Sequence, residues 1–104
     1  MTEVIDALGD ILYVVYGAGV TFGINLDEAF RIVHESNMSK LCKNEKEAKE
    51  SVAYYAEHPD FLNINVKYRL AADGKSYVVY NADTGKILKS KYFMKPDFSN
   101  MLNQ

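Results

Sequence analysis

The chain has 104 residues, of which 48% are hydrophobic and 25% are charged. This composition is typical of one small globular domain with one modest core. The formal net charge of −2 gives no overall basic field of the kind that attracts nucleic acid. We therefore expect no nucleic-acid partner.

The compartment can be inferred from the cysteine content and from the N-terminus. Cys42 is the one cysteine, so no internal disulfide can form, and its expected role is that of a small hydrophobic residue near a helix end. The N-terminus is acidic and has no signal-peptide pattern, and the apolar run 11–22 is too short to span a bilayer. We expect a cytoplasmic protein without a membrane partner.

The first predicted element is a helix over residues 3–22 that begins with EVIDALGDILYVVYG. On a helical wheel, Glu3, Asp6 and Asp10 fall within an arc of roughly 60°. We call these three residues the acidic stripe. The other directions of the helix are apolar, which is typical of a helix that is mostly buried.

The acidic stripe has two interpretations. Carboxylates buried without a partner are costly, and no Lys or Arg precedes Arg31, so a bound divalent metal ion is one explanation. The other is that the stripe is the solvated side of a surface helix. Gly17 and Gly19 weaken this helix by roughly 1 kcal/mol each relative to Ala, which makes sense where another helix approaches closely.

Two more helices are predicted downstream. Asn25 and Glu28 have the spacing of a capping box at the start of a helix that ends near Leu41. The short loop before it predicts an antiparallel helical hairpin with the first helix. Asn44 and Glu47 repeat the capping pattern before a helix over residues 45–58, which stops at Pro59.

The residue pattern changes from helical to strand-like after Pro59. Short strands are predicted over residues 65–70, 76–81 and 87–90, with turns at Asp73-Gly74 and Thr84-Gly85. Pro96 argues against a central strand in the remaining tail. We expect a mainly α single domain over residues 1–104, with a helical part over 1–58 and a β-hairpin tail over 59–104 that leans on the helices.

Three segments, DALGDILYVVYG, GINLDEAF and VHESNMSKL, resemble the all-α NTP pyrophosphatase superfamily. This superfamily includes MazG-like proteins, dCTP pyrophosphatase and phosphoribosyl-ATP pyrophosphohydrolase, and the likeness is greatest to its phage- and virus-type members. The resemblance implies a helical bundle that binds Mg²⁺, with Mn²⁺ as an alternative, through the motifs E-E-x-x-E and E-x-x-D on two helices. It also implies hydrolysis of a nucleoside triphosphate to the monophosphate and pyrophosphate.

The resemblance carries over to a few positions of this chain. Asp10 falls on the Asp of E-x-x-D, whereas the Glu of that motif falls on Ala7. Asp6 lies one turn before Asp10 and is placed beside it as a ligand, and Glu3 ranks third. Residues 3–6 form an E-x-x-D themselves, one turn out of register. Asn37 and Lys40 match the polar pair that touches the substrate's phosphates or sugar. The sequence assigns no catalytic residue.

The helix with E-E-x-x-E has no counterpart in this sequence. Such an apolar first helix needs more partners than one hairpin supplies, so we expect a homodimer or homotetramer that completes a helical bundle. The leading hypothesis is therefore an Mg²⁺-dependent NTP pyrophosphohydrolase, either a truncated form or one completed by another chain. The alternative is a non-catalytic oligomerising or nucleotide-binding scaffold. A third reading, nucleic-acid binding by Lys86, Lys89, Lys91 and Lys95, is weaker because the whole chain is acidic.

Overall fold

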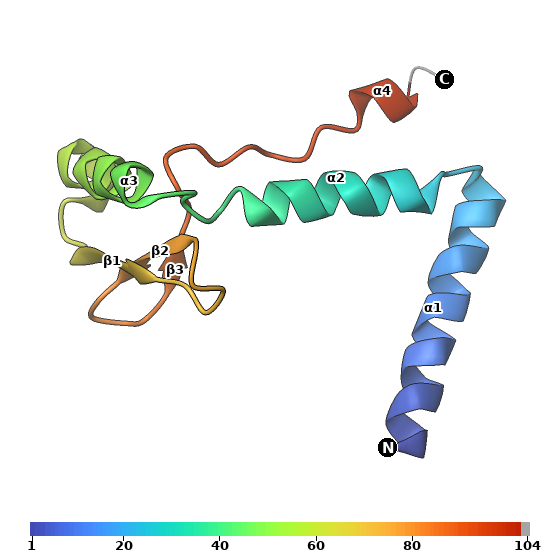
Figure 1. The fold of residues 1–104 in the computed structure, drawn as a ribbon. Helices are drawn as coiled ribbons and strands as arrows, with labels where there is room; N and C mark the ends of the chain where they lie inside the picture. The colour runs from blue at the N-terminus through green and yellow to red at the C-terminus, as the bar shows by residue number, and fades with distance from the viewer. Residues whose placement is uncertain (103–104) are drawn as a thin grey trace. The chain divides into compact units, whose positions relative to one another are not determined.

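The computed structural model describes residues 1–102, which form two compact units. The first unit comprises residues 1–33 together with the C-terminal residues from Asp97, and the second comprises His34–Pro96. Figure 1 labels the helices and strands of both units, and each unit is described by itself below.

The first helix, α1 (Thr2–Phe22), has the predicted extent. It ends at Gly23, which adopts the left-handed conformation with φ 67° that glycine tolerates best. The Gly23 amide donates to the Val20 carbonyl at 3.2 Å, and the Ile24 amide donates to the Gly19 carbonyl at 2.8 Å. These two bonds satisfy carbonyl groups of the last turn and stop the helix.

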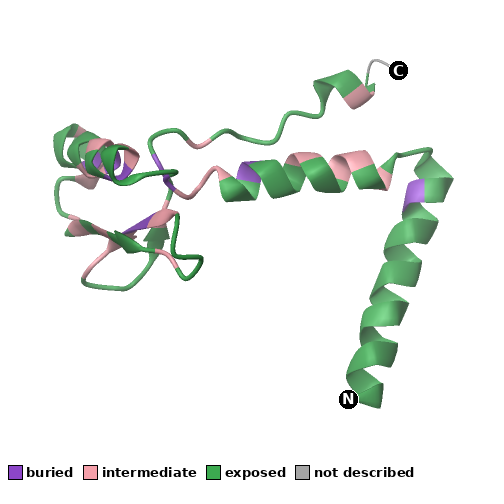
Figure 2. Ribbon diagram, viewed as in Figure 1, coloured by how far each residue is buried: buried purple, intermediate pink, exposed green. Residues whose placement is uncertain are grey.

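Nearly all of α1 is exposed, and Gly19 is its one buried residue (Figure 2). A Cβ atom on Gly19 would lie 2.6 Å from Leu26 Cδ1, so this glycine allows the close approach predicted for it, whereas Gly17 has nothing within 4 Å. The contact with Leu26 is confined to the end of α1. The packed antiparallel hairpin predicted from the short connection is therefore not formed in the described part of the chain, because neither helix covers the apolar length of the other.

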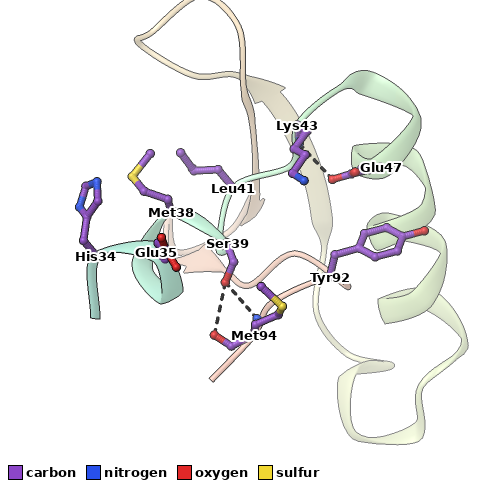
Figure 3. A pocket seen from close by; sticks show the side chains of 9 residues that line it. All are labelled: His34, Glu35, Met38, Ser39, Leu41, Lys43, Glu47, Tyr92 and Met94. Carbon is purple, nitrogen blue, oxygen red and sulfur yellow. Dashed lines mark hydrogen bonds between the residues drawn. The ribbon is translucent and has the colours of Figure 1, made fainter. Parts of the chain in front are cut away.

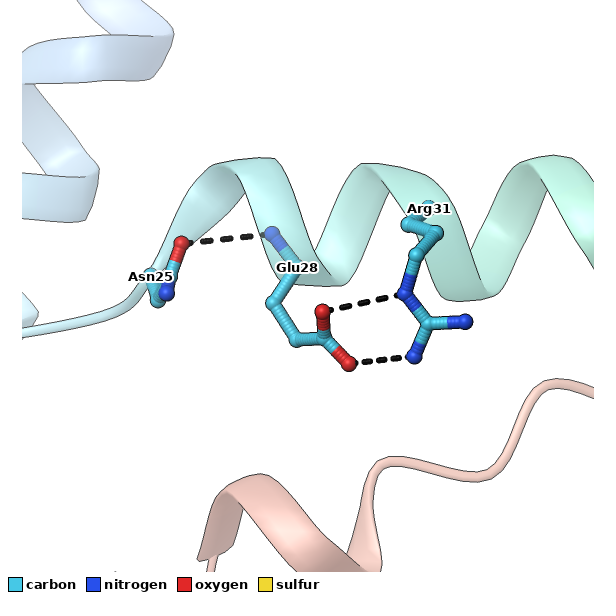
Figure 4. Close-up of polar contacts among 3 residues, drawn as sticks. All are labelled: Asn25, Glu28 and Arg31. Carbon is cyan, nitrogen blue, oxygen red and sulfur yellow. Dashed lines mark hydrogen bonds and ion pairs between the residues drawn. The ribbon is translucent and has the colours of Figure 1, made fainter.

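The second helix, α2 (Leu26–Met38), begins at the predicted cap. The Glu28 amide donates to Asn25 Oδ1 at 3.2 Å (Figure 4). The Glu28 carboxylate does not complete the capping box, because it binds the guanidinium of Arg31, with Arg31 Nε 3.0 Å from Oε2. This charged hydrogen bond holds the pKa of Glu28 below its usual value.

The helix α2 ends three residues before the predicted end at Leu41. The Ser36 hydroxyl donates to the Met94 carbonyl at 2.8 Å, and the Met94 amide donates to Ser39 Oγ at 2.9 Å. Both bonds join the end of α2 to a segment more than 50 residues downstream. These long-range contacts accompany a helix end that local sequence patterns did not predict.

The third helix, α3 (Glu45–Glu57), starts with a complete capping box. The Glu47 amide donates to Asn44 Oδ1 at 2.9 Å, and the Glu47 carboxylate accepts from the Lys43 amide at 3.1 Å. The helix ends just before Pro59, as predicted, and a short 3-10 helix, η1 (Pro59–Phe61), follows it.

A three-stranded antiparallel sheet in the order β1-β2-β3 follows. It consists of β1 (Val66–Leu70), β2 (Tyr77–Asn81) and β3 (Ile87–Leu88), close to the predicted strands. Gly74 and Gly85 have φ values of 72° and 78°, which confirms both predicted glycine turns. The Asp73 carboxylate accepts from the amides of Ser76 and Lys75, each at 2.8 Å, and these bonds lower the pKa of Asp73.

The core of the second unit lies between α3 and one face of the sheet (Figures 1 and 2). This confirms that the β part leans on a helix. Cys42 is fully buried, its Sγ lies 3.6 Å from Ser51 Oγ, and its backbone pairs with Tyr77, so its role as a small core residue is also confirmed. The buried hydrophobic residues of this core are Cys42, Ala48, Tyr55 and Val79.

The remaining tail contains a short helix, α4 (Ser99–Leu102), that no sequence pattern predicted. Pro96 lies outside any strand, as expected. Overall the described chain is mainly α with one small sheet. In the second unit, α3 of the helical part packs with the sheet of the β-hairpin tail.

Candidate metal and substrate site

The acidic stripe lies on the first half of α1, and Glu3, Asp6 and Asp10 are all exposed. At 1.5 Å of rise per residue, Glu3 and Asp10 are separated by about 10 Å along the helix axis, too far to share one ion directly. Asp6 and Asp10 are one turn apart on the same face, where two side chains can meet. The stripe can therefore supply two neighbouring carboxylates to an ion rather than three.

Oxygen donors of this kind suit Mg²⁺, which usually keeps several waters. However, residues 1–102 contain no group of three or more His, Cys, Asp or Glu residues placed to hold a metal ion. The stripe thus fits part of a Mg²⁺ donor set, and a complete site needs donors from elsewhere. Ala7, at the position of the motif's Glu, adds none.

The predicted substrate residues lie at the end of α2, in the second unit. Asn37 is exposed in the last turn, and its carbonyl accepts from the Lys40 amide at 3.2 Å. Lys40 lies beyond the helix and is half-buried, and its carbonyl accepts from the Ser90 amide at 3.0 Å. The structure therefore brings Asn37 and Lys40 close to each other in one turn, whereas the acidic stripe belongs to the first unit.

A pocket of about 630 Å³ lies beside this turn within the second unit (Figure 3). The Ser39 hydroxyl accepts a hydrogen bond from the Met94 amide at 2.9 Å, and this bond positions the segment around Met94 in the pocket lining. Tyr92 forms another part of the lining, and its hydroxyl donates to Glu50, which raises the pKa of Tyr92. The pocket is lined by His34, Glu35, Met38, Ser39, Leu41, Lys43, Glu47, Tyr92 and Met94.

Sequence reasoning missed this pocket. Asn37 and Lys40 do not line it, and Tyr92 and Met94 come from a tail in which we found no period. The serine pair Ser36 and Ser39 was the available signal, because each hydroxyl bonds to Met94. A serine pair at the end of a helix does not by itself identify so distant a partner.

The helix α1 is also long and apolar enough to cross a membrane, judged by length and composition alone. The expectation that the apolar run was too short counted only residues 11–22 and is wrong on this point, because the helix runs unbroken from Thr2 to Phe22. Length and composition do not distinguish a membrane span from an apolar helix of a bundle.

Comparison with known proteins supports the resemblance for the N-terminal part of the chain. Residues 1–37 match the family model for phosphoribosyl-ATP pyrophosphohydrolase, a family of the MazG-like all-α NTP pyrophosphatase superfamily. The matched segment covers α1 and almost all of α2, including the acidic stripe and Asn37.

A relative encoded by a virus covers more of the chain. An uncharacterized protein of Acanthamoeba polyphaga mimivirus is 56% identical over 92 residues, which is 88% of this chain. The aligned region is 37% of the mimivirus protein, so the chain spans little more than a third of that relative's length. No solved structure matches the chain.

Proposed function

We propose that this chain contributes α1 and α2 to an Mg²⁺-dependent pyrophosphohydrolase that converts a nucleoside triphosphate to the monophosphate and pyrophosphate. The observation that supports the proposal is that the family match to residues 1–37 includes the acidic stripe and Asn37. Asp10 and Asp6 are the proposed metal ligands, and Glu3 is a further carboxylate of the same stripe.

When bound, Mg²⁺ or Mn²⁺ would neutralise triphosphate charge and lower the pKa of a bound water. The residues of this chain are proposed to bind the ion and the nucleotide. Asp6 and Asp10 hold the ion, while the Asn37 amide and the Lys40 ammonium bind phosphate or sugar oxygens of the nucleotide. An amide and an ammonium donate hydrogen bonds suited to such oxygens.

The proposed site needs carboxylates from a second source. One source is another copy of the chain, in a homodimer or homotetramer that completes a helical bundle around α1. Another is the additional length that the mimivirus relative possesses. The exposed apolar faces of α1 support either source, because an unpartnered helix of this composition gains free energy from burial.

A bundle suits α1 better than a bilayer does. The apolar length of α1 contains Asp6 and Asp10, and an ionised Asp at the centre of a membrane helix costs roughly 2.5 to 3.5 kcal/mol. In a bundle the same stripe can face a metal ion or water. We therefore retain the proposal of a cytoplasmic protein, and the mimivirus relative is consistent with a virus-encoded one.

The proposal is tested by measuring pyrophosphate release from a panel of NTPs and dNTPs with MgCl₂. Asp10→Asn removes a proposed ligand, and Asp27→Asn is the matched control because Asp27 is an exposed acid on α2 outside the stripe. We expect release by the native chain and by Asp27→Asn, and loss of release in Asp10→Asn. The preferred base would identify the substrate.

The alternative function is a non-catalytic scaffold that binds nucleotide or oligomerises. Ala7 favours it, and so does the lack, within residues 1–102, of a group of three or more residues placed to hold a metal ion. No release by the native chain, together with binding of a nonhydrolysable NTP analogue in calorimetry, would support this alternative. Release that persists in Asp10→Asn would instead show that the assigned ligands are wrong.

A further inference from the structure

The two faces of the small sheet differ in composition. Val66, Tyr68, Tyr77, Val79 and Leu88 pack in the core with α3. Side chains alternate across a strand, so the intervening residues project from the opposite face, which we call the outer face. The outer face comprises Lys67, Arg69, Val78, Tyr80 and Ile87.

The outer face and its surroundings are strongly basic. Residues 61–96 contain seven Lys and Arg residues and two acidic residues, Asp73 and Asp83. Both acids lie in the turns between the strands, and the Asp73 carboxylate is engaged by two backbone amides. The strands β1, β2 and β3 themselves contain no acid, so nothing on the outer face neutralises Lys67 and Arg69.

Aromatic rings lie beside these cations. The Arg69 guanidinium lies 5.6 Å from the centre of the Tyr80 ring, and Lys67 is the direct cross-strand partner of Tyr80. Two similar pairs follow β3 along the chain: Lys89 Nζ lies 4.5 Å from the Phe93 ring centre, and Lys91 Nζ lies 5.8 Å from that of Tyr92. The second pair lies beside α3 and not on the outer face, because the Lys91 amide donates to Ser51 Oγ and the Tyr92 hydroxyl donates to Glu50. On the outer face itself, Tyr80 therefore lies between two cations, Lys67 and Arg69, of the neighbouring strand.

We propose that the outer face binds single-stranded nucleic acid. Lys67 and Arg69 are exposed and about 7 Å apart along β1, so they can contact successive phosphates of one extended strand. Tyr80 offers an aromatic ring on which an unpaired base can stack, and guanidinium planes stack on bases as well. This inference is independent of the proposed pyrophosphohydrolase, because it uses none of the residues assigned there.

Charge and shape favour a nucleic acid over other anionic partners. An acidic protein or a lipid headgroup would satisfy the cations, but neither requires aromatic rings paired with them. The aromatic and cationic pairs match a polymer that alternates phosphates with flat bases. α3 packs on the inner face, and among residues 1–102 no other helix forms an extensive contact with the sheet. On the outer face Val78 is buried, whereas Lys67, Arg69 and Ile87 are exposed and Tyr80 is half-buried, so a strand can reach the two cations of β1 and the edge of the Tyr80 ring.

Fluorescence anisotropy of labelled oligo(dT) and oligo(U) tests the proposal, with the purified chain titrated between 50 and 200 mM KCl. We expect saturable binding that weakens with salt. For single strands the logarithmic slope is about −0.7 per phosphate contact, so Lys67→Gln/Arg69→Gln should make the slope shallower by about 1.4. Tyr80→Ala should weaken binding roughly tenfold at an unchanged slope, because it removes stacking and no charge.

The matched control is Lys46→Gln/Lys49→Gln, which removes the same charge from exposed positions on α3. It should leave binding within about twofold of the native value. Equal losses in both double variants would overturn the proposal, because binding would then follow net charge alone. Absence of oligonucleotide binding, or binding only to vesicles containing phosphatidylserine, would overturn it too. Circular dichroism of each variant confirms that the exposed substitutions leave the fold intact.

Discussion

At the scale of single residues, Tyr55 links α3 to the segment that follows the sheet. It is 6% exposed, and its hydroxyl donates to the Lys89 carbonyl at 2.6 Å. Burial raises the pKa of the Tyr55 hydroxyl, so it is a protonated donor at neutral pH. This bond spans 34 residues and fixes the start of the tail on the core.

The variant Tyr55→Phe tests that bond. It keeps the ring and leaves the Lys89 carbonyl without this donor, so the free energy of unfolding should fall by about 1 kcal/mol. Tyr54→Phe is the control, since the neighbouring tyrosine is 40% exposed and should show no change. Urea denaturation followed by circular dichroism measures both. Equal effects would show that the bond to Lys89 contributes no specific stability.

Alanine substitutions at two glycines of α1 should affect stability differently. Gly17→Ala meets nothing within 4 Å in the single chain and should stabilise the helix by roughly 1 kcal/mol. Gly19→Ala places its Cβ 2.6 Å from Leu26 Cδ1, so that side chain must move and the gain should be lost. Thermal unfolding of the two variants measures the difference. A destabilising Gly17→Ala would show that a partner helix approaches at that position.

At the scale of elements, the β1–β2 turn should respond to pH. Amide hydrogen bonds from Ser76 and Lys75 lower the pKa of Asp73 in the folded state. A lowered pKa stabilises the fold above the unfolded value of about 3.9, and this contribution is lost as the pH falls through the folded pKa. We expect stability to fall below about pH 4, with a weaker fall in Asp73→Asn. The pH dependence of the urea midpoint measures it, and an identical dependence in both proteins would contradict the assignment.

The elements also show how far sequence reasoning reaches. The caps at Asn25 and Asn44, the stop at Gly23 and the two glycine turns were predictable because each depends on residues a few positions apart. The end of α2, the pocket beside it and the tail helix α4 were not. The first two depend on Met94, which contacts Ser36 and Ser39 from more than 50 residues away.

The same distinction applies to the candidate site. The acidic stripe and its neighbours follow from helical periodicity and from a resemblance that the family match supports over residues 1–37. Completion of a metal site depends on donors outside this set, and helical periodicity gives no information about them. The net charge describes the chain as a whole, and it averages an acidic N-terminal part with a basic stretch over residues 61–96.

At the scale of the whole molecule, the exposed apolar surface of α1 predicts self-association. Leu8 and Leu12 are 56% and 49% exposed in the single chain and would be buried in a bundle. Leu8→Glu/Leu12→Glu should shift the protein toward monomer, because an unpaired carboxylate is costly in an apolar interface. The control is Tyr13→Glu/Thr2→Glu. It adds the same charge to two other exposed positions of α1 and keeps both leucines.

Sedimentation velocity across a concentration series measures the outcome. We expect the native chain and the control variant to sediment as a dimer or tetramer and the double leucine variant as a smaller species. A native chain that remains monomeric at all concentrations would contradict self-association. Solubility only in detergent would favour a membrane role for α1 instead.

The complete burial of Cys42 gives the second unit a built-in reporter of its own opening. Its thiol is fully enclosed beside Ser51, and the chain has no other cysteine. A thiol reagent can therefore modify the native protein only when α3 and the sheet separate locally, and the labelling rate measures the free energy of that opening. The helix α1 has no cysteine, so only the second unit reacts with the thiol reagent. The opening of the second unit can therefore be followed whether or not α1 is associated with another copy of the chain.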